Sequence, residues 1–383
     1  MAPTTVESPR APTVGHTTAS HEPDTTSNSN PAFYATNRYK LDSLPLELAP
    51  AKDLTLDRKI SAASRLAANG TIRDLLTNHG AVHFKGLGLK SAEEFSRFAQ
   101  SFGWRPHEDI GNPVRRTVLA YNVATANEGP NTQPVYPHNE FGLSPHYPAY
   151  VFFYCLSAPE TGGETPVNNS ITLYDKLKQQ VPDFIKVVEE KGVRYQLFYR
   201  NRPRSDISSP GTSLLQSYGI NVLDSDDTET ARSKIEDEIR RLPTATWQWE
   251  NQSPDNKLGD LRVFQRLPAV RRHEQTGKQA FFNNVISRYL NAKTAGTLDP
   301  PYLNKDGDYQ PPALYADDTP IPHEYLEAAV QIVNDTRSLV LWNTGDVLLI
   351  DNHAVQHGRE PWTGDRKLLA SLWDEPSVGV QKS

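Results

Sequence analysis

Two histidines and a glutamate, placed in two distant stretches of the chain, are the residues best suited to metal chemistry. His138 and Glu140 stand in the segment YPHNE, and His357 stands near the C-terminus in DNHAVQHGR. In an extended segment, residues i and i+2 point to the same side, so His138 and Glu140 could reach one ion. Two imidazoles and one carboxylate form the facial ligand set of non-haem Fe(II) oxygenases, although the same set also serves catalytic zinc.

An arginine follows the distant histidine and offers a second chemical feature. Arg366 stands shortly after His357 and just before an apolar, strand-like run. Its planar guanidinium could bind the far carboxylate of a dicarboxylate ligand through two parallel hydrogen bonds. An ordinary surface arginine in a hairpin would have the same spacing. The residues alone therefore leave open whether Arg366 binds a ligand.

Composition restricts the class of protein. The chain has 383 residues, is 37% hydrophobic and carries a formal net charge of −6 with a pI of about 6.0. That charge argues against a nucleic-acid partner, because proteins that bind nucleic acids normally carry a strong excess of basic residues. The single cysteine, Cys155, excludes an intramolecular disulfide. The chain starts without the apolar region of a secretory signal and contains no run long enough to span a membrane, so we expect a cytoplasmic protein without a membrane partner.

The hydrophobic pattern predicts one domain after a polar tail. Residues 1–30 are rich in Thr, Ser, Pro and Asn, so we expect a disordered N-terminal tail. We expect residues 31–383 to form a single domain with a helical insertion around 171–241. Helical spacing occurs at 54–78, from 91 onward, and at 171–191, 226–241 and 323–335. Strand patterns occur at 80–86, 117–123, 150–156, 243–249, 261–267, 279–283, 338–342, 346–352 and 368–373.

Many short strands with turn signals predict a mainly β fold with flanking helices, in the form of a jelly roll. The same chain also carries three motifs in a fixed order: H-x-E, then a G-G-E-T-P turn, then D-N-x-x-x-x-H-G-R with G-x-R behind it. In combination they resemble the TauD/TfdA family, and within it the clavaminate synthase-like enzymes that use Glu as the carboxylate ligand. The resemblance covers roughly residues 75–375. It implies a double-stranded β-helix and a 2-oxoglutarate-dependent dioxygenase that uses Fe(II), 2-oxoglutarate and O2.

The resemblance also implies roles for individual residues. His138 and Glu140 match the proximal metal ligands, and His357 matches the distal ligand because Gly358 and Arg359 follow it. His353 does not hold the matching position. Arg366 matches the residue that binds the 5-carboxylate of 2-oxoglutarate, and Thr165 matches a threonine that hydrogen-bonds the same cosubstrate.

One position departs from the pattern of taurine dioxygenase itself. Four residues beyond the 2-oxoglutarate arginine, that enzyme has a second arginine that binds the substrate sulfonate. This chain has Ala370 there. A sulfonate would lose its main partner, so taurine is not the expected substrate.

The sequence leaves several candidates for the substrate contacts and several alternatives for the function. Asn112, Arg115, Arg116, Asn122 and Asn283 are candidates to line the substrate pocket, but each could instead make local turn or strand hydrogen bonds. The two arginines suit a carboxylate, so we expect a small, amino-acid-derived substrate of secondary metabolism. It could undergo hydroxylation, desaturation or cyclisation. A homo-oligomer stays open. The alternatives are an iron oxygenase of the same fold that does not consume 2-oxoglutarate, a non-catalytic barrel that binds a small molecule, and a zinc hydrolase.

Overall fold

The computed structural model describes residues 31–37, 43–114, 116–126, 129–203, 213–305, 307 and 309–375. The described residues from Ala32 onward form one compact unit. The predicted disordered tail lies outside the described residues. Within the described ranges, no helix is both long and apolar enough to cross a membrane.

A large sheet provides one wall of the barrel. Its strands run in the order β1-β2-β3-β18-β8-β21-β6-β5, and β4 pairs with β21. The pairs within it are antiparallel except that β2 runs parallel to β3. The bounds are β1 Phe33–Ala35, β2 Leu46–Pro50, β3 Ala81–Phe84, β4 Arg105–Pro106, β5 Val118–Ala120, β6 Val123–Thr125, β8 Tyr150–Ser157, β18 Val347–Asp351 and β21 Lys367–Asp374.

A smaller antiparallel sheet provides the other wall, in the order β17-β10-β19-β7. The bounds are β7 Val135–His138, β10 Thr165–Asn169, β17 Ser338–Val340 and β19 Val355–Arg359. Alternation along β8 shows how the two walls pack. Val151 and Phe153 join a core cluster with Val167 of β10, whereas Phe152 and Tyr154 join the cluster on the opposite face. This two-sheet arrangement confirms the predicted double-stranded β-helix. The chain as a whole is mixed α/β with many antiparallel strands, and helices flank the sheets as expected.

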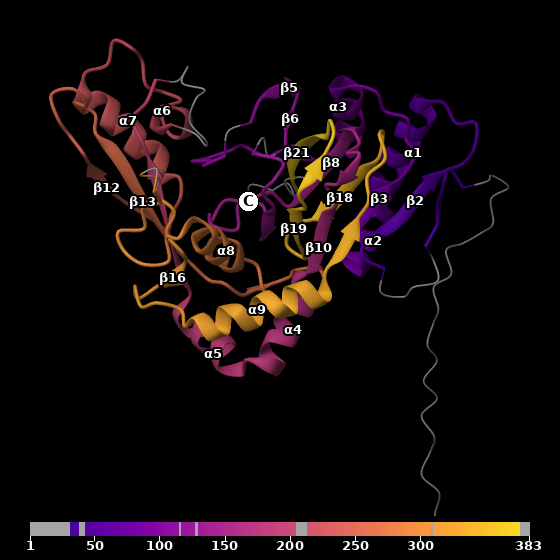
Figure 1. Cartoon of the computed structure of the whole chain (residues 1–383). Helices are drawn as coiled ribbons and strands as arrows, with labels where there is room; N and C mark the ends of the chain where they lie inside the picture. The colour runs from indigo at the N-terminus through magenta and orange to yellow at the C-terminus, as the bar shows by residue number, and fades with distance from the viewer. Residues whose placement is uncertain are drawn as a thin grey trace, which may run out of the picture. The chain divides into compact units, whose positions relative to one another are not determined.

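Three helices cover the outer face of the large sheet. They are α1 Leu56–Ala68, α2 Thr71–His79 and α3 Ala92–Gln100; Figure 1 shows α1 and α2 beside β2 and β3, and α3 contacts β8 and β21. The predicted helix at 54–78 breaks in two because Gly70 adopts a left-handed φ of 87° between α1 and α2. The side chains of Thr55 and Ser91 cap α1 and α3 by accepting hydrogen bonds from backbone N–H groups. The apolar sides of these helices pack on Phe84 and Phe152.

The predicted helical insertion is partly wrong. It contains α4 Ser170–Gln180, α5 Pro182–Lys191, α6 Leu214–Ser217 and α7 Thr228–Arg240, but also strand β11, Val193–Tyr199. β11 pairs with β13 and β16 in a third sheet of order β12-β13-β11-β16. The side chains of Val193, Tyr195 and Tyr199 lie on one face of β11 and are buried. The remaining bounds are β12 Ala245–Glu250, β13 Asp260–Leu267, β16 Leu314–Tyr315, α8 Val285–Ala295 and α9 His323–Thr336.

Other predicted elements match closely or are shortened. The predicted helix at 323–335 is α9, which packs against α4 and α8 in one apolar cluster. The predicted strand at 117–123 is a hairpin of β5 and β6, because Asn122 turns the chain with a φ of 51°. The predicted strand at 279–283 is reduced to β15, Gln279–Ala280, paired with β14, Arg271–Arg272. A further short pair joins β9, Thr161–Gly162, to β20, Trp362–Thr363.

Phe152 tests the packing between the large sheet and its helices. The side chain is fully buried, and its ring centroid lies 5.0 Å from that of Phe102 and 6.3 Å from that of Phe98. We expect Phe152→Ala to lower the free energy of unfolding by about 3–5 kcal/mol, because it removes buried apolar area and leaves a cavity. Urea unfolding would measure this. Tyr121→Ala is the control, since Tyr121 is 63% exposed and should change stability little. Equal midpoints for the two variants would contradict the packing described.

Candidate functional site

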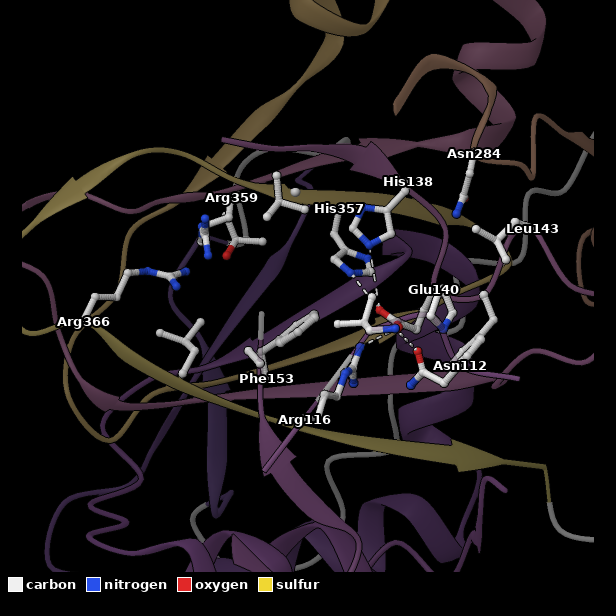
Figure 2. A pocket seen from close by; sticks show the side chains of 18 residues that line it. Asn112, Arg116, His138, Glu140, Leu143, Phe153, Asn284, His357, Arg359 and Arg366 are labelled. Carbon is white, nitrogen blue, oxygen red and sulfur yellow. Dashed lines mark hydrogen bonds and ion pairs between the residues drawn. The ribbon is translucent and has the colours of Figure 1, made fainter. Parts of the chain in front are cut away.

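The two histidines and the glutamate meet between neighbouring strands of the small sheet. His138 is the last residue of β7, and its Cα is the cross-strand partner of His357 in β19. The Glu140 Oε2 atom lies 3.4 Å from His357 Nε2 and 3.9 Å from His138 Nε2. One donor atom from each residue lies within 4.8 Å of the others. Figure 2 shows the three side chains converging on one point, so the structure brings together the predicted ligand set.

Glu140 reaches this point from a turn rather than from an extended strand. β7 ends at His138, and the next residues are held by Asn352 in the turn between β18 and β19. The Glu140 backbone N–H donates to Asn352 Oδ1 at 2.8 Å, and Asn352 Nδ2 donates back to the Glu140 carbonyl at 2.9 Å. Asn139 Nδ2 donates to the carbonyl of Asn352 at 2.7 Å. These buried amides fix the carboxylate relative to both histidines.

The electrostatics of the cluster suit a divalent cation. Arg116 Nη2 donates to Glu140 Oε1 at 2.6 Å. Burial would raise the pKa of Glu140, but Arg116 and the two imidazoles outweigh it and hold the pKa well below its usual range. Burial, together with repulsion from His357, lowers the pKa of His138 to about 4. At neutral pH Glu140 is therefore ionised and His138 is neutral, which are the forms that ligate metals.

The Nε2 atoms of both histidines face Glu140, which also fits a metal site. His138 Nδ1 lies 2.9 Å from the Tyr136 carbonyl, so Nδ1 carries the proton and Nε2 keeps its lone pair toward Glu140. His357 Nδ1 is buried and has no hydrogen-bond partner among the described residues. The donor set of two imidazoles and one carboxylate, open on the cavity side, matches Fe(II) and also zinc.

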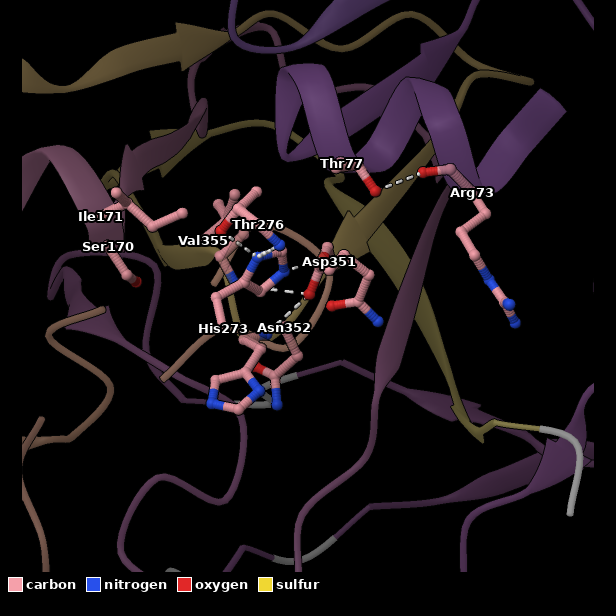
Figure 3. Close-up of polar contacts among 12 residues, drawn as sticks. Arg73, Thr77, Ser170, Ile171, His273, Thr276, Asp351, Asn352 and Val355 are labelled. Carbon is pink, nitrogen blue, oxygen red and sulfur yellow. Dashed lines mark hydrogen bonds and ion pairs between the residues drawn. The ribbon is translucent and has the colours of Figure 1, made fainter. Parts of the chain in front are cut away.

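A second polar cluster stabilises the turn that precedes His357. Asp351 accepts hydrogen bonds from the backbone N–H groups of His353 and Ala354. Its other oxygen lies 2.9 Å from Nε2 of the buried His273, whose Nδ1 lies 2.8 Å from Thr276 Oγ1 (Figure 3). Asp351 therefore organises the turn and does not join the metal cluster. His353, whose ring packs against Phe282, also lies outside that cluster.

A cavity of about 120 Å³ joins the cluster to the predicted cosubstrate residues. Its wall includes His138, Glu140, His357, Thr165 and Arg366. Figure 2 shows Arg366 pointing into this cavity from the side opposite Asn284.

The predicted cosubstrate residues keep groups free to bind an anion. Trp342 Nε1 donates to Thr165 Oγ1 at 3.0 Å, which leaves the threonine hydroxyl hydrogen to donate elsewhere. Arg366 Nε donates to the Gly163 carbonyl at 2.9 Å. Burial and repulsion from Arg359 lower the pKa of Arg366 to about 10, so the guanidinium stays charged at neutral pH.

At two glycines of the motifs, neighbouring atoms approach the backbone so closely that no side chain would fit. Gly163 has a φ of 70°, and a Cβ there would lie 2.7 Å from Cδ of Arg366. A Cβ at Gly358 would lie 2.5 Å from the Val135 carbonyl oxygen, where β19 crosses β7. A side chain at either position would displace Arg366 or separate the strands that carry the histidines.

The predicted substrate residues divide between the cavity and the scaffold. Arg116 and Asn112 line the metal cavity, while Arg115 lies outside the described residues. Asn122 lines a neighbouring cavity, and its Nδ2 donates to the Leu372 carbonyl. Asn283 is buried away from the cavity wall, where its amide bonds the Ala269 carbonyl and the Val285 N–H.

Sequence reasoning missed several residues of the cavity wall, and three of them contribute a polar or aromatic side chain near the predicted site. Asn284 lines the cavity instead of its neighbour Asn283, and Phe153 and Arg359 also line it. Arg359 could have been found from its place in the H-G-R motif. Phe153 could have been found from the alternation of β8, because it lies on the same face of the strand as Val151, which packs toward the small sheet. No signal separates Asn284 from Asn283.

Asn352 provides a test of how the carboxylate is positioned. We expect Asn352→Ala to weaken Mn(II) binding by about 10-fold or more, because it frees the Glu140 turn and leaves three backbone groups without partners. Isothermal titration calorimetry would measure the affinity, with circular dichroism to verify folding. Asn69→Ala removes an exposed asparagine that bonds only its local backbone and should bind Mn(II) as the wild type does. Unchanged affinity in a folded Asn352→Ala variant would refute the positioning role.

The lowered pKa of His353 leads to a predicted pH dependence of stability. Burial lowers the pKa of His353 to about 4, and its buried Nε2 has no hydrogen-bond partner among the described residues. Between pH 6.5 and 4 the unfolded chain binds a proton that the folded chain resists, so stability falls as pH falls through this window. The loss is at most about 3 kcal/mol. We expect His353→Gln to lose less stability than the wild type over this range in urea titrations. Parallel pH profiles would contradict the assignment.

Comparison with known proteins places the chain among related sequences. The profile of "Taurine catabolism dioxygenase TauD, TfdA family" matches residues 44–373. A clavaminate synthase-like protein of Arabidopsis thaliana is 29% identical over 298 residues, which cover 78% of this chain and 82% of that protein. The dapdiamide synthesis protein DdaC of Enterobacter agglomerans is 22% identical over 304 residues, covering 79% and 84%. A taurine dioxygenase structure from Burkholderia xenovorans has a TM-score of 0.47 at 16% identity, covering 90% of each chain. Because the family profile spans most of its length, this chain belongs to the TauD/TfdA family of Fe(II)- and 2-oxoglutarate-dependent dioxygenases.

Proposed function

We propose that this oxygenase oxidises an unactivated C–H bond of a small, amino-acid-derived substrate in secondary metabolism. The observation that carries the proposal is the shared cavity, in which His138, Glu140 and His357 face the same space as Arg366 and Thr165. A metal cluster and a cationic dicarboxylate clamp in one cavity are what an Fe(II) and 2-oxoglutarate reaction requires. Hydroxylation, desaturation and cyclisation are all compatible with that reaction.

Each residue of the site has a defined part in this proposal. When bound, Fe(II) and 2-oxoglutarate supply the oxidising power by consuming O2 and releasing succinate and CO2. His138, Glu140 and His357 hold the metal on one face and leave the cavity side open. Arg366 pairs with the 5-carboxylate of 2-oxoglutarate, and the Thr165 hydroxyl donates to the same group. Phe153, with its ring 5.0 Å from that of His357, keeps water from that side of the cluster.

The substrate class rests on charge and on relatives. Arg116 and Asn112 provide a cation and an amide in the cavity wall, which suit a carboxylate and its polar neighbours. Ala370 stands where taurine dioxygenase has its sulfonate-binding arginine, so taurine is disfavoured. The names of the two relatives connect them with dapdiamide synthesis and with clavaminate synthase, which supports a biosynthetic role here.

The competing functions make different demands on the site. An iron oxygenase without 2-oxoglutarate, a zinc hydrolase and a binding barrel need no buried cationic clamp for a dicarboxylate. Arg366 is a partly buried cation whose charge no carboxylate within hydrogen-bond distance neutralises among the described residues, and that favours an anionic cosubstrate. A hydrolase would in addition turn over with zinc and without O2.

Arg366 provides the direct test. We expect Arg366→Ala to weaken 2-oxoglutarate binding by about 10- to 100-fold, because a charge-assisted contact is worth about 1.5–3 kcal/mol. The measurement is an anaerobic titration of the Fe(II)-loaded protein with 2-oxoglutarate, followed by the visible charge-transfer band and by calorimetry. Metal affinity should stay close to that of the wild type. Lys367→Ala, at an exposed neighbour, should bind 2-oxoglutarate normally. Equal 2-oxoglutarate affinities in all three proteins would reject the clamp.

A further inference from the structure

A second, larger cavity adjoins the metal cavity and shares part of its wall. Its volume is about 460 Å³, and Asn112, Val114 and Arg116 line both spaces. The metal cavity of about 120 Å³ must already accept the cosubstrate, and alone it is smaller than the roughly 300–1,000 Å³ of ordinary small-molecule sites. A third cavity of about 390 Å³ also adjoins the metal cavity, but it shares Ala126, Arg366 and Leu368 at the end of the predicted cosubstrate arginine. The second cavity shares Arg116, which pairs with Glu140, so it is the larger space that opens beside the metal cluster.

Strand β21 connects the two cavities. Leu368, Ala370 and Leu372 alternate along one face of this strand. Leu368 lines the metal cavity together with Arg366, whereas Ala370 and Leu372 line the second cavity. The small side chain at 370 leaves the second cavity open where a longer residue would fill it. A molecule lying along β21 would pass from the metal cavity into the second cavity.

The wall of the second cavity contains one cationic and one anionic side chain. Arg116, in the shared wall, is the cation; its Nη2 pairs with Glu140, and its buried Nε has no hydrogen-bond partner among the described residues. Among the described residues of the cavity wall, Asp109 is the anionic one. The fully buried His107 ring also lines this cavity, and its Nδ1 lies 2.8 Å from Asp374 Oδ1. Its Nε2 has no hydrogen-bond partner among the described residues. These groups suit a ligand with an anionic end and a cationic or N–H-bearing end.

We propose that the substrate is an extended zwitterion of about dipeptide size that lies along β21 across both cavities. Its carboxylate contacts Arg116 at the shared wall, and its amino-bearing end lies in the second cavity near Asp109 and His107. Because Arg116 contacts the metal-cluster residue Glu140, the oxidised C–H bond belongs to the part of the substrate that carries the carboxylate. This inference rests on the proposed function and makes its substrate class specific.

The test combines a panel of probes with a cavity-filling variant. The probes are dipeptides, the same dipeptides with an acetylated amine or an amidated carboxylate, and free amino acids. The assay is succinate formation from 2-oxoglutarate with Fe(II) and O2, with mass spectrometry of the products. We expect dipeptides to stimulate succinate formation at least about 10-fold more than free amino acids, and blocking of either terminus to remove that stimulation.

Ala370→Leu fills the second cavity without adding charge. We expect it to lower kcat/KM for the stimulating dipeptide by about 10-fold or more, while the anaerobic Fe(II)/2-oxoglutarate charge-transfer band stays as in the wild type. Lys367→Leu is the matched control, because it adds the same side chain to an exposed position of β21. Asp109→Asn, at an exposed position, should raise KM for the dipeptide more than it lowers kcat.

The outcomes separate this inference from the proposed function. Stimulation by free amino acids equal to that by dipeptides, no stimulation by any dipeptide while the wild-type band forms, or an unchanged kcat/KM in Ala370→Leu would each overturn the extended substrate. Absence of the band in the iron-loaded wild type would instead overturn the proposed function. Dipeptide stimulation that is lost in Ala370→Leu with the band intact would support both.

Discussion

The burial of one carboxylate determines how this site is built. Glu140 is 7% exposed, and a buried carboxylate without a partner would be strongly destabilising. Arg116 stabilises one carboxylate oxygen at 2.6 Å, while the other oxygen faces the two imidazoles. The glutamate is thereby held with one oxygen engaged and the other directed to the position of a metal. Any displacement of the turn that carries Glu140 would separate these charges, so the turn must be fixed as firmly as the strands.

Buried asparagines fix that turn where strand pairing ends. Asn139 bonds the carbonyls of Asn352 and Val355 and accepts from the N–H of Asn283, while Asn284 accepts from the N–H of Asn139. An amide side chain can donate and accept at once, so it satisfies backbone groups that would otherwise be buried without partners. Through these contacts the segment before α8 is joined to the loop after β7 and the turn before β19. Asn283 thus serves the site as part of its scaffold, not as a substrate contact.

Sequence patterns predicted elements whose signals are local, and they failed where tertiary contacts decide. β8, β18, β21 and α9 were predicted close to their bounds because their periodicity is continuous. β11 was missed because it lies between helical patterns and depends on pairing with β13. The motifs identified the three metal-binding candidates, but the register that sets His138 opposite His357 belongs to the sheet. The partner of Arg116 could not be predicted, since nothing in the sequence distinguishes a substrate contact from a pair with Glu140.

The residues of β21 are divided between the wall of the metal cavity and the wall of the second cavity. β21 is paired with β8 on one side and with β6 on the other, so its residues have fixed spacing. Arg366 stands directly before β21, and the register is irregular between Lys367 and Leu368, so positions 366 and 370 are at most roughly 13 Å apart at about 3.3 Å per residue. A long cationic side chain at 370 could reach back toward the metal and hold a compact anion there. With Ala370 in place, a ligand must itself extend to contact that part of the wall. In the substrate arrangement proposed above, β21 would therefore set the minimum length of a substrate that uses the second cavity.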